Sequence, residues 1–311
     1  MALDAHARRF LDRLAAATPR RIGELDIGQR RASLEQLLSL GGEPEMVANV
    51  AEREIPGPGG TLRTRIYTPR DADRCALPGL VYFHGGGLVA GSLDTHDGIC
   101  RSLANSSGAR LVSVNYRLAP EAKFPAAVED ACEAMRWTAA HAVELGIDPG
   151  RLGIGGDSAG ATLAAVACVA ISAQRTARIA FQFLLCPILD HAAETESRRA
   201  FEAGYLLDRD TLAHDLAHYL RPSDDPADPR VSPLRAPTLE GLPPTCIHTA
   251  ECDPLRDEGE LYARRVAEAG VQVKYRCHAG MIHMFYGLGT LIPAAAKAYD
   301  VIGADLRDLL V

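Results

Sequence analysis

Two short glycine-rich motifs constrain this chain more than any other feature. The first is His84-Gly85-Gly86-Gly87, and the second is Gly156-Asp157-Ser158-Ala159-Gly160. Gly-x-Ser-x-Gly describes a sharp strand-to-helix turn that lifts a serine hydroxyl clear of a sheet, and its small residues are needed because a Cβ would collide with the crowded backbone. His-Gly-Gly-Gly describes a loop whose bare N–H groups can approach a substrate oxygen. Together the motifs predict a nucleophile and a place to hold a negative oxygen.

Apolar segments that look like strands alternate with helical patterns along most of the chain. Strands are expected at 62–67, 80–83, 111–116, 152–155, 179–185, 245–249 and 271–277. Helices are expected at 126–143, 255–269 and 291–310. Such alternation is typical of a mostly parallel sheet with helices on both faces. The predicted fold class is therefore α/β.

Two segments do not fit this alternation. Residues 1–50 follow helical spacing, and residues 191–237 combine helical patterns, charges and prolines without a convincing strand. Because the second segment lies between two core strands, we expect it to cross the carboxyl edge of the sheet, where open α/β sheets bind ligands. We predict a core of residues 51–190 and 238–311 under a helical cap made by both segments. The alternative is that residues 191–237 form a surface insertion without substrate contact.

Composition narrows the class of partner. The chain has 311 residues, of which 47% are hydrophobic, and this is enough for a large core. The formal net charge is −7, and the basic residues Arg8-Arg9, Arg20-Arg21 and Arg30-Arg31 are isolated pairs. Nucleic-acid-binding proteins normally carry a basic surplus or stripe. We therefore expect a small-molecule substrate and no nucleic acid.

The cysteines and the N-terminus point to a cytoplasmic protein. None of the eight cysteines forms a Cys-x-x-Cys pair, so we expect reduced thiols and no metal site. Charged residues interrupt the first apolar stretch, which argues against a secretory signal. The longest apolar run, residues 159–173, is too short to span a bilayer. No stable membrane association is expected.

A serine hydroxyl near neutral pH needs a base, and that base needs an acid to hold its tautomer. In the strand–turn–helix setting of Ser158 the acid and the histidine come later in the chain. His283 is favoured because it sits in a flexible, partly apolar loop after the last strand, and His278 is the main alternative. His248 lies in an apolar strand and is expected to be a buried, satisfied histidine.

The acid should follow the strand at 245–249. Asp253 is favoured because it lies in the loop between that strand and the next helix. Glu251 remains possible but sits closer to the strand end. Asp257 and Glu258 fall in the first helical turn, where the helix dipole usually explains a carboxylate.

The oxyanion needs donors that are in place before charge develops. We expect them to be the N–H groups of Gly85, Gly86 and Gly87, together with Ala159 at the start of a helix. His84 is expected to hold the loop by hydrogen bonding. Asp157 either orders the turn through backbone N–H groups, which we favour, or tunes the site electrostatically.

Five motifs in order resemble one family over nearly the whole chain: His84-Gly-Gly-Gly, Asn115-Tyr116-Arg117-Leu118-Ala119-Pro120-Glu121, Gly156-Asp-Ser-Ala-Gly160, Asp253-Pro254-Leu255-Arg256-Asp257-Glu258 and His283-Met284-Phe285. The chain is similar to hormone-sensitive-lipase-like esterases (bacterial family IV) of the α/β-hydrolase fold. The resemblance implies that Ser158 is the nucleophile, Asp253 the acid and His283 the base. It also implies cofactor-free hydrolysis of short- to medium-chain carboxylic esters. Ala161 departs from the family pattern, which often has another glycine there.

Further expectations concern the pocket and the assembly. Residues near the motifs are expected to contact substrate: Leu88, Tyr116, Tyr205, Leu206, Met281 and Phe285. Relatives often pair through the last strand and helix, so a homodimer is expected there, with 271–277 as an exposed edge.

Two other functions remain open at this stage. An amidase, or a deacetylase acting on aryl esters or amides, would use the same triad. A non-catalytic small-molecule receptor is a remote alternative, since such a protein would be expected to lack part of the triad.

Overall fold

The computed structural model describes residues 2–17, 22–72 and 76–310. Its centre is an eight-stranded sheet with the strand order β1-β2-β4-β3-β5-β6-β7-β8. The strands are β1 (Asn49–Gly57), β2 (Gly60–Thr68), β3 (Leu77–Phe83), β4 (Arg110–Asn115), β5 (Ile147–Asp157), β6 (Gln182–Leu185), β7 (Thr245–Cys252) and β8 (Val273–Ile282). Strands β3 to β8 are parallel to one another, whereas β2 is antiparallel to both β1 and β4. This arrangement confirms the predicted α/β class.

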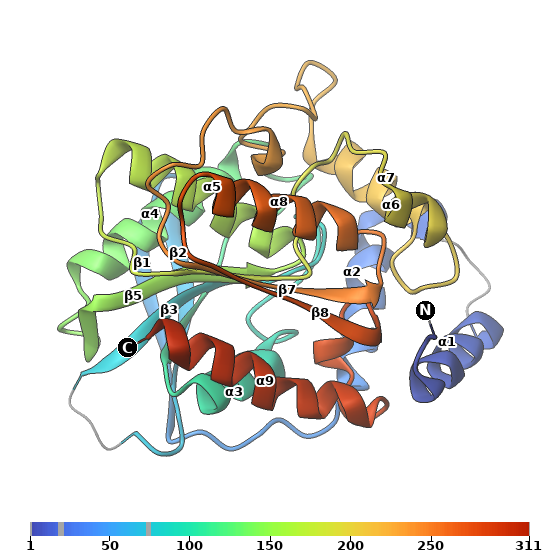
Figure 1. The fold of residues 1–311 in the computed structure, drawn as a ribbon, viewed down its shortest axis with the longest axis horizontal. Coiled ribbons are helices and arrows are strands. Elements are labelled where there is room, and N and C mark those ends of the chain that lie inside the picture. Colours follow the sequence, from blue (N-terminus) through green and yellow to red (C-terminus); the bar gives the residue numbers. More distant parts are fainter. Residues whose placement is uncertain (1, 18–21, 73–75, 311) are drawn as a thin grey trace.

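Helices cover both faces of the sheet (Figure 1). Three of them, α4 (Ala126–Ala140), α5 (Ala159–Gln174) and α8 (Arg256–Glu268), lie on one face. The opposite face carries α3 (Asp97–Ser107) and α9 (Pro293–Leu309). The remaining elements are α1 (Ala5–Ala17), α2 (Ile27–Ser39), α6 (Glu196–Ala200), α7 (Arg209–Tyr219) and the short helices η1 (Ile22–Glu24), η2 (Pro233–Arg235) and η3 (Phe285–Gly287).

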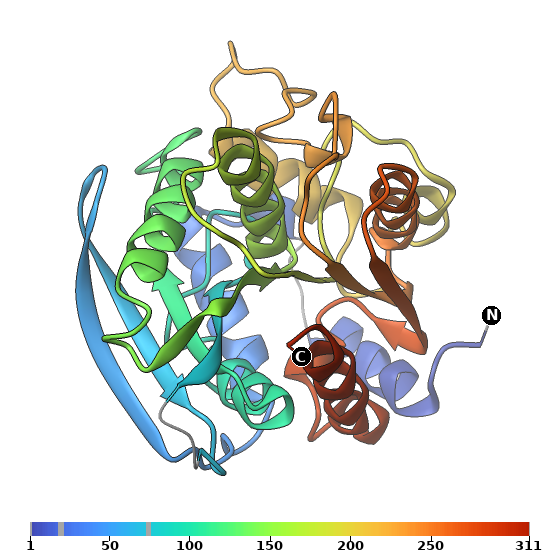
Figure 2. The same cartoon turned by 60° about the vertical axis from the view of Figure 1, so that its left-hand side comes forward.

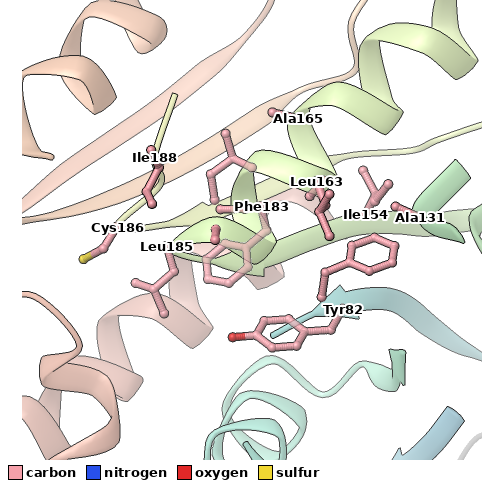
Figure 3. Packing of buried hydrophobic residues seen from close by; sticks show 14 of the residues in the cluster. Tyr82, Ala131, Ile154, Leu163, Ala165, Phe183, Leu185, Cys186 and Ile188 are labelled. Carbon is pink, nitrogen blue, oxygen red and sulfur yellow. The ribbon is translucent and has the colours of Figure 1, made fainter. Parts of the chain in front are cut away.

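The central strands are apolar because both of their faces are covered. Every residue of β3 and of β6 is buried. Leu163 of α5 packs above the sheet near Ile154 and Phe183, as Figure 3 shows. This packing gives the loops at the carboxyl ends of the parallel strands a rigid base.

The edges of the sheet were harder to predict from sequence than its centre. The helical spacing of residues 1–50 extends too far, since β1 already begins at Asn49. Figure 2 shows β1 and β2 as a hairpin at one edge, and only Ile55 of β1 is buried, so β1 lacks a clear apolar alternation. The hairpin turns between Gly57 and Gly60, within the run Pro56-Gly57-Pro58-Gly59-Gly60. Helix α3 was not predicted, because its sequence is rich in Gly, Ser and Asn, which are weak helix formers.

The segment of residues 191–237 contains α6, α7 and η2 and, among its described residues, no strand. In Figure 1, α6 and α7 gather with α1 and α2 at one end of the sheet. Among the described cysteines, six are buried and free, and Cys277 is exposed and free; Cys75 lies outside the described residues. In the described part of the chain, no helix has both the length and the apolar character needed to cross a membrane.

Candidate active site

Ser158 occupies the turn between β5 and α5. Its backbone has φ 51° and ψ −121°, a conformation that a residue with a side chain rarely adopts. A Cβ on Gly156 would lie 2.5 Å from the carbonyl oxygen of Phe83, and one on Gly160 would lie 2.0 Å from the same atom. The turn therefore requires glycine on both sides of the serine, as the motif indicates.

Ser158, His283 and Asp253 form one hydrogen-bonded chain. The Nε2 atom of His283 lies 3.0 Å from Ser158 Oγ, and its Nδ1 lies 2.7 Å from Asp253 Oδ2. Because a carboxylate only accepts, Nδ1 carries the proton and Nε2 is free to accept from the serine. Ser158 follows β5, Asp253 follows β7 and His283 follows β8, so the carboxyl ends of parallel strands at one edge of the sheet bring the three side chains together.

The alternative bases and acids are engaged elsewhere. The Nε2 of His278 lies 2.9 Å from Nδ1 of His248, and His248 is buried within the sheet as expected. Glu251 accepts a hydrogen bond of 2.7 Å from Gly280 N–H, and Asp257 accepts one of 2.7 Å from Ser197 N–H. None of these groups is in the chain that reaches Ser158.

The loop after β3 supplies bare N–H groups. Gly86 and Gly87 have φ 118° and 67°, which side chains disfavour. Among the described contacts, the N–H groups of Gly86, Gly87 and Ala159 have no partner. Gly85 does not share this role, which corrects the prediction: its N–H donates to Asp157 Oδ1 at 3.0 Å and faces His96 Nε2 at 3.2 Å.

Asp157 is a buried anion that ties the two motifs together. Besides Gly85, it accepts hydrogen bonds from Tyr82 Oη at 2.6 Å and Tyr286 Oη at 2.9 Å, and His96 Nε2 lies 3.4 Å away. Burial alone would raise the pKa of Asp157, but His96 and the two hydroxyl donors hold it below its usual value. The carboxylate therefore stays charged and binds a backbone N–H group, but this group is that of Gly85 in the loop after β3 and not one in the serine turn, as favoured from the sequence.

His84 has the structural role expected of it. Its Nδ1 lies 2.8 Å from Gly85 O, and its ring stacks on Tyr116 with centroids 4.4 Å apart. Burial, followed by the nearby His96, lowers the pKa of His84 to about 3. A neutral imidazole therefore packs behind the loop.

A cavity of about 930 Å³ opens onto Ser158, His283, Gly86 and Gly87. Its walls come largely from leucines of the two helical segments: Leu11, Leu14, Leu34, Leu37, Leu206, Leu207, Leu212 and Leu216. The leucines of α1, α2 and α7 follow ordinary helical spacing, which does not distinguish a core face from a cavity wall, and Leu206 and Leu207 lie in the irregular segment between α6 and α7. His191 also lines the cavity, and burial lowers its pKa to about 4.

Of the six residues expected to contact substrate, Leu206 alone belongs to this lining. Tyr116 is buried and its hydroxyl donates to His84 O at 2.7 Å. Leu88, Met281 and Phe285 are likewise buried in the core. Tyr205 instead packs edge-on against Phe201, with ring centroids 4.8 Å apart. Proximity to a motif in sequence did not place these five side chains in the cavity.

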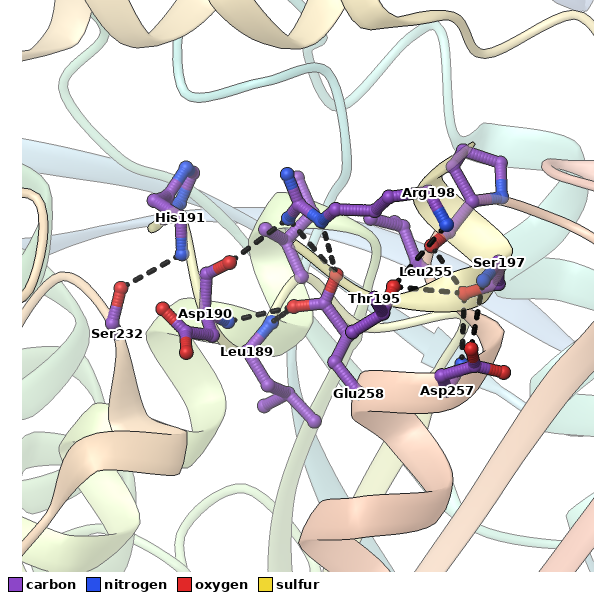
Figure 4. Close-up of polar contacts among 12 residues, drawn as sticks. Leu189, Asp190, His191, Thr195, Ser197, Arg198, Ser232, Leu255, Asp257 and Glu258 are labelled. Atoms are coloured by element: carbon purple, nitrogen blue, oxygen red, sulfur yellow. Dashed lines mark hydrogen bonds and ion pairs between the residues drawn. The ribbon is translucent and has the colours of Figure 1, made fainter. Parts of the chain in front are cut away.

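Two buried arginine–carboxylate pairs attach the helical segments, and sequence reasoning missed both. Glu258 accepts from Leu189 N–H at 2.7 Å and Asp190 N–H at 2.6 Å, and Arg198 donates to it at 2.9 Å (Figure 4). Burial raises the pKa of Glu258 to about 6. The carboxylate thus anchors the start of the 191–237 segment on α8, beyond a helix-dipole role.

The second pair joins Arg30 to Asp215. The sequence suggests an isolated basic pair at Arg30-Arg31, yet Arg30 is only 7% exposed and binds Asp215 through two hydrogen bonds. No local sequence pattern predicts this contact, because Arg30 and Asp215 are far apart in sequence.

Cys186, Asp253 and His283 place potential metal ligands within 4.8 Å of one another. Burial raises the pKa of the Cys186 thiol well above its usual value, so the sulfur is held in its poorly ligating protonated form. His283 and Asp253 are already hydrogen-bonded to each other. Hydrogen bonding therefore accounts for this cluster.

Comparison with known proteins identifies the family of this chain. Residues 80–287 match a family model described as the alpha/beta hydrolase fold. The chain is 41% identical to a carboxylic ester hydrolase, LipN, of Mycobacterium tuberculosis, covering 91% of this chain and 76% of that protein. It is 37% identical to an ethyl acetate hydrolase of Pseudomonas putida, covering 86% and 84%.

Solved structures agree as well. An ester hydrolase from the metagenome of Lake Arreo, complexed with a derivative of bipyridine phosphonate, has a TM-score of 0.95 and 38% identity over 98% of both chains. This chain belongs to the α/β-hydrolase family. Within that family it is a hormone-sensitive-lipase-like carboxylesterase.

Proposed function

We propose that Ser158, His283 and Asp253 perform the ester hydrolysis, with Gly86, Gly87 and Ala159 holding the oxyanion. The observation that carries this assignment is the unbroken hydrogen-bond chain from Asp253 through His283 to Ser158, which ends in the cavity. Serine, histidine and carboxylate in this order can activate a hydroxyl that is otherwise a weak nucleophile.

The reaction proceeds in two acyl transfers. His283 Nε2 takes the proton of Ser158 as Oγ attacks the ester carbonyl carbon, and the carbonyl oxygen gains negative charge beside the three free N–H groups. The alcohol leaves with the proton from His283, which gives an acyl-enzyme. Water then attacks the acyl carbon with His283 as base, and the acid is released as Ser158 regains its proton. Each oxyanion donor is worth about 10²–10³-fold in kcat.

We propose short- to medium-chain esters as substrates. A cavity of about 930 Å³ with leucine walls favours an apolar chain of moderate length. Each buried methylene contributes only about 0.8 kcal/mol, so preference among chain lengths should be graded. A hydrolysis panel of esters of increasing acyl length, with one amide, tests this. Faster amide than ester turnover would favour the amidase alternative.

We also propose that residues 1–50 and 191–237 act as the cap. Leucines from both segments line the cavity above Ser158, which supports substrate contact by both. Proteolytic removal of residues 1–41 tests this. Unchanged chain-length preference in the shortened protein would contradict it.

The assignment of the nucleophile is tested by Ser158→Ala. We expect ester hydrolysis to fall by a factor on the order of 10⁴ or more while the protein stays folded. A fluorophosphonate probe followed by mass spectrometry should label Ser158 in the unmodified protein. Full activity in a folded Ser158→Ala protein, or labelling at another residue, would overturn the assignment.

We propose a homodimer through β8. This strand ends the sheet and its first half is only partly buried, so its free edge can pair with a second copy. Sedimentation velocity of the intact protein at micromolar concentration tests this. A monomer across that range would contradict it.

A further inference from the structure

The Arg30–Asp215 pair joins the two helical segments directly over the site. Arg30 Nε donates to Asp215 Oδ1 at 3.0 Å and Nη2 donates to Oδ2 at 2.7 Å, a bidentate geometry. Arg30 comes from α2 and Asp215 from α7, which lie at the same end of the sheet in Figure 1. Both side chains line the cavity that contains Ser158, and both are buried.

Asp215 touches the oxyanion loop. A Cβ built on Gly87 would lie 1.9 Å from Asp215 Oδ2, so the carboxylate fills the space where any side chain at position 87 would go. The charge therefore stands beside one of the N–H donors proposed to receive the oxyanion.

Other groups around this contact help to hold it in place. His214 Nδ1 lies 3.0 Å from Asp215 Oδ1, and its Nε2 lies 3.1 Å from Leu25 O. The neighbouring Arg31 donates from Nε to Val89 O at 2.8 Å, just after the same loop. Helix α2 thus contacts Val89 directly through Arg31 and reaches Gly87 by way of Arg30 and Asp215.

A carboxylate at this position without its guanidinium partner would oppose the reaction. Negative charge develops on the substrate oxygen as Ser158 attacks, and like charges at close range in a partly dry site repel strongly. The guanidinium of Arg30 cancels the charge of Asp215 at that moment. We propose that Arg30 is a positioning residue of the esterase reaction, holding Asp215 against Gly87 and neutralising it; this inference rests on the proposed oxyanion site.

The test compares Arg30→Met, Asp215→Asn and the double variant on a neutral short-chain ester. We expect Arg30→Met to lower kcat by roughly 10- to 100-fold with KM within about threefold, because the change acts on the transition state. Asp215→Asn should stay within about fivefold of the unmodified enzyme. The double variant should recover most of the kcat lost in Arg30→Met.

A purely structural tie between the two helices predicts the opposite pattern. Asp215→Asn would then lose as much as Arg30→Met, and the double variant would be no better than either; that result would overturn the proposal. If Arg30→Met does not fold, Asp215→Asn still tests the proposal, because a kcat loss of tenfold or more in Asp215→Asn contradicts charge compensation by Arg30.

A matched control is Arg198→Met, which unpairs the buried Glu258 away from the cavity lining. We expect it to lower the unfolding temperature while kcat stays within about threefold, and a kcat loss equal to that of Arg30→Met would overturn the proposal. Active enzyme is counted by fluorophosphonate labelling of Ser158. Absence of labelling in the unmodified protein would instead refute the proposed function itself.

Discussion

The floor and the roof of the cavity are built on different principles. The floor consists of the Ser158 turn and the Gly86–Gly87 loop, where backbone N–H groups and glycine geometry fix the chemistry. The roof consists of α1, α2 and α7, which present leucine side chains from two segments distant in sequence. Substitutions in the floor therefore disturb backbone geometry that the chemistry needs, whereas exchange of the leucines in the roof changes the shape of the cavity.

The largest effect should follow a change at the acid of the floor. Asp253→Asn should lower kcat by a factor on the order of 10⁴, since the amide can donate to Nδ1 and hold the wrong tautomer of His283. Steady-state kinetics on a short chromogenic ester measures this. Glu251→Gln, the other carboxylate at the end of β7, is the control and should stay within about threefold. An equal loss of kcat in Glu251→Gln would contradict the assignment of Asp253 as the single acid of the triad.

Gly87→Ala should rank second, with a kcat loss of about 10²–10³-fold. The new Cβ meets Asp215 and the residue has φ 67°, so the loop must move away from the oxyanion. Gly108→Ala is the control, because Gly108 has φ 72° with open space around it and does not line the cavity. It shares the backbone strain, and its kcat should be unchanged. Normal kcat in Gly87→Ala would remove this residue from the oxyanion site.

Glu258, which anchors the 191–237 segment on α8, should make the free energy of unfolding depend on pH, with a smaller effect than the two changes above. The pKa of Glu258 is raised from 4.5 to about 6, so the folded state binds a proton that the unfolded state releases. Its contribution to stability is fully present below about pH 4.5 and is lost as pH rises through about 6. This amounts to roughly 2 kcal/mol. Urea unfolding from pH 4.5 to 7 should show that the free energy of unfolding falls more steeply with pH in the unmodified protein than in Glu258→Gln. Parallel curves for the two proteins would contradict the raised pKa.

Changes to the leucines of the roof should have the smallest effect on rate and a visible effect on chain-length preference. Leu212→Ala enlarges the cavity, so the ratio of kcat/KM for a longer ester to that for a short one should rise by about 3- to 10-fold. Leu261→Ala, on the exposed side of α8, is the control and should leave the ratio alone. A large fall in kcat for every ester in Leu212→Ala would contradict the claim that the leucines of the roof affect chain-length preference more than rate.

The sequence predicted the floor well because its requirements are local. Glycine next to Ser158 follows from a steric rule that acts within a few residues, and the positions of Asp253 and His283 follow from the ends of two clearly apolar strands. Gly85 was misassigned because its N–H is taken by the side chain of Asp157, a contact between two motifs that neither motif reveals alone.

The roof could not be predicted in the same way. Its leucines follow the spacing of any amphipathic helix, and Arg30 looks like a solvated charge until α7 brings Asp215 beside it. The edge strand β1 was missed for a related reason, since a strand with one buried side chain carries little periodic signal. These features depend on contacts between residues that are far apart in the sequence, and local sequence patterns do not reveal such contacts.

Asp157 limits how such a site can evolve. One buried anion restrains the serine turn that it precedes, the glycine loop through Gly85, and the histidine loop through Tyr286. A substitution that disturbs this hub shifts all three segments at once, so intermediate catalysts with one element improved and the others intact are hard to reach. Specificity for new esters is therefore expected to evolve through single substitutions in α1, α2 and α7, which leave these three segments undisturbed.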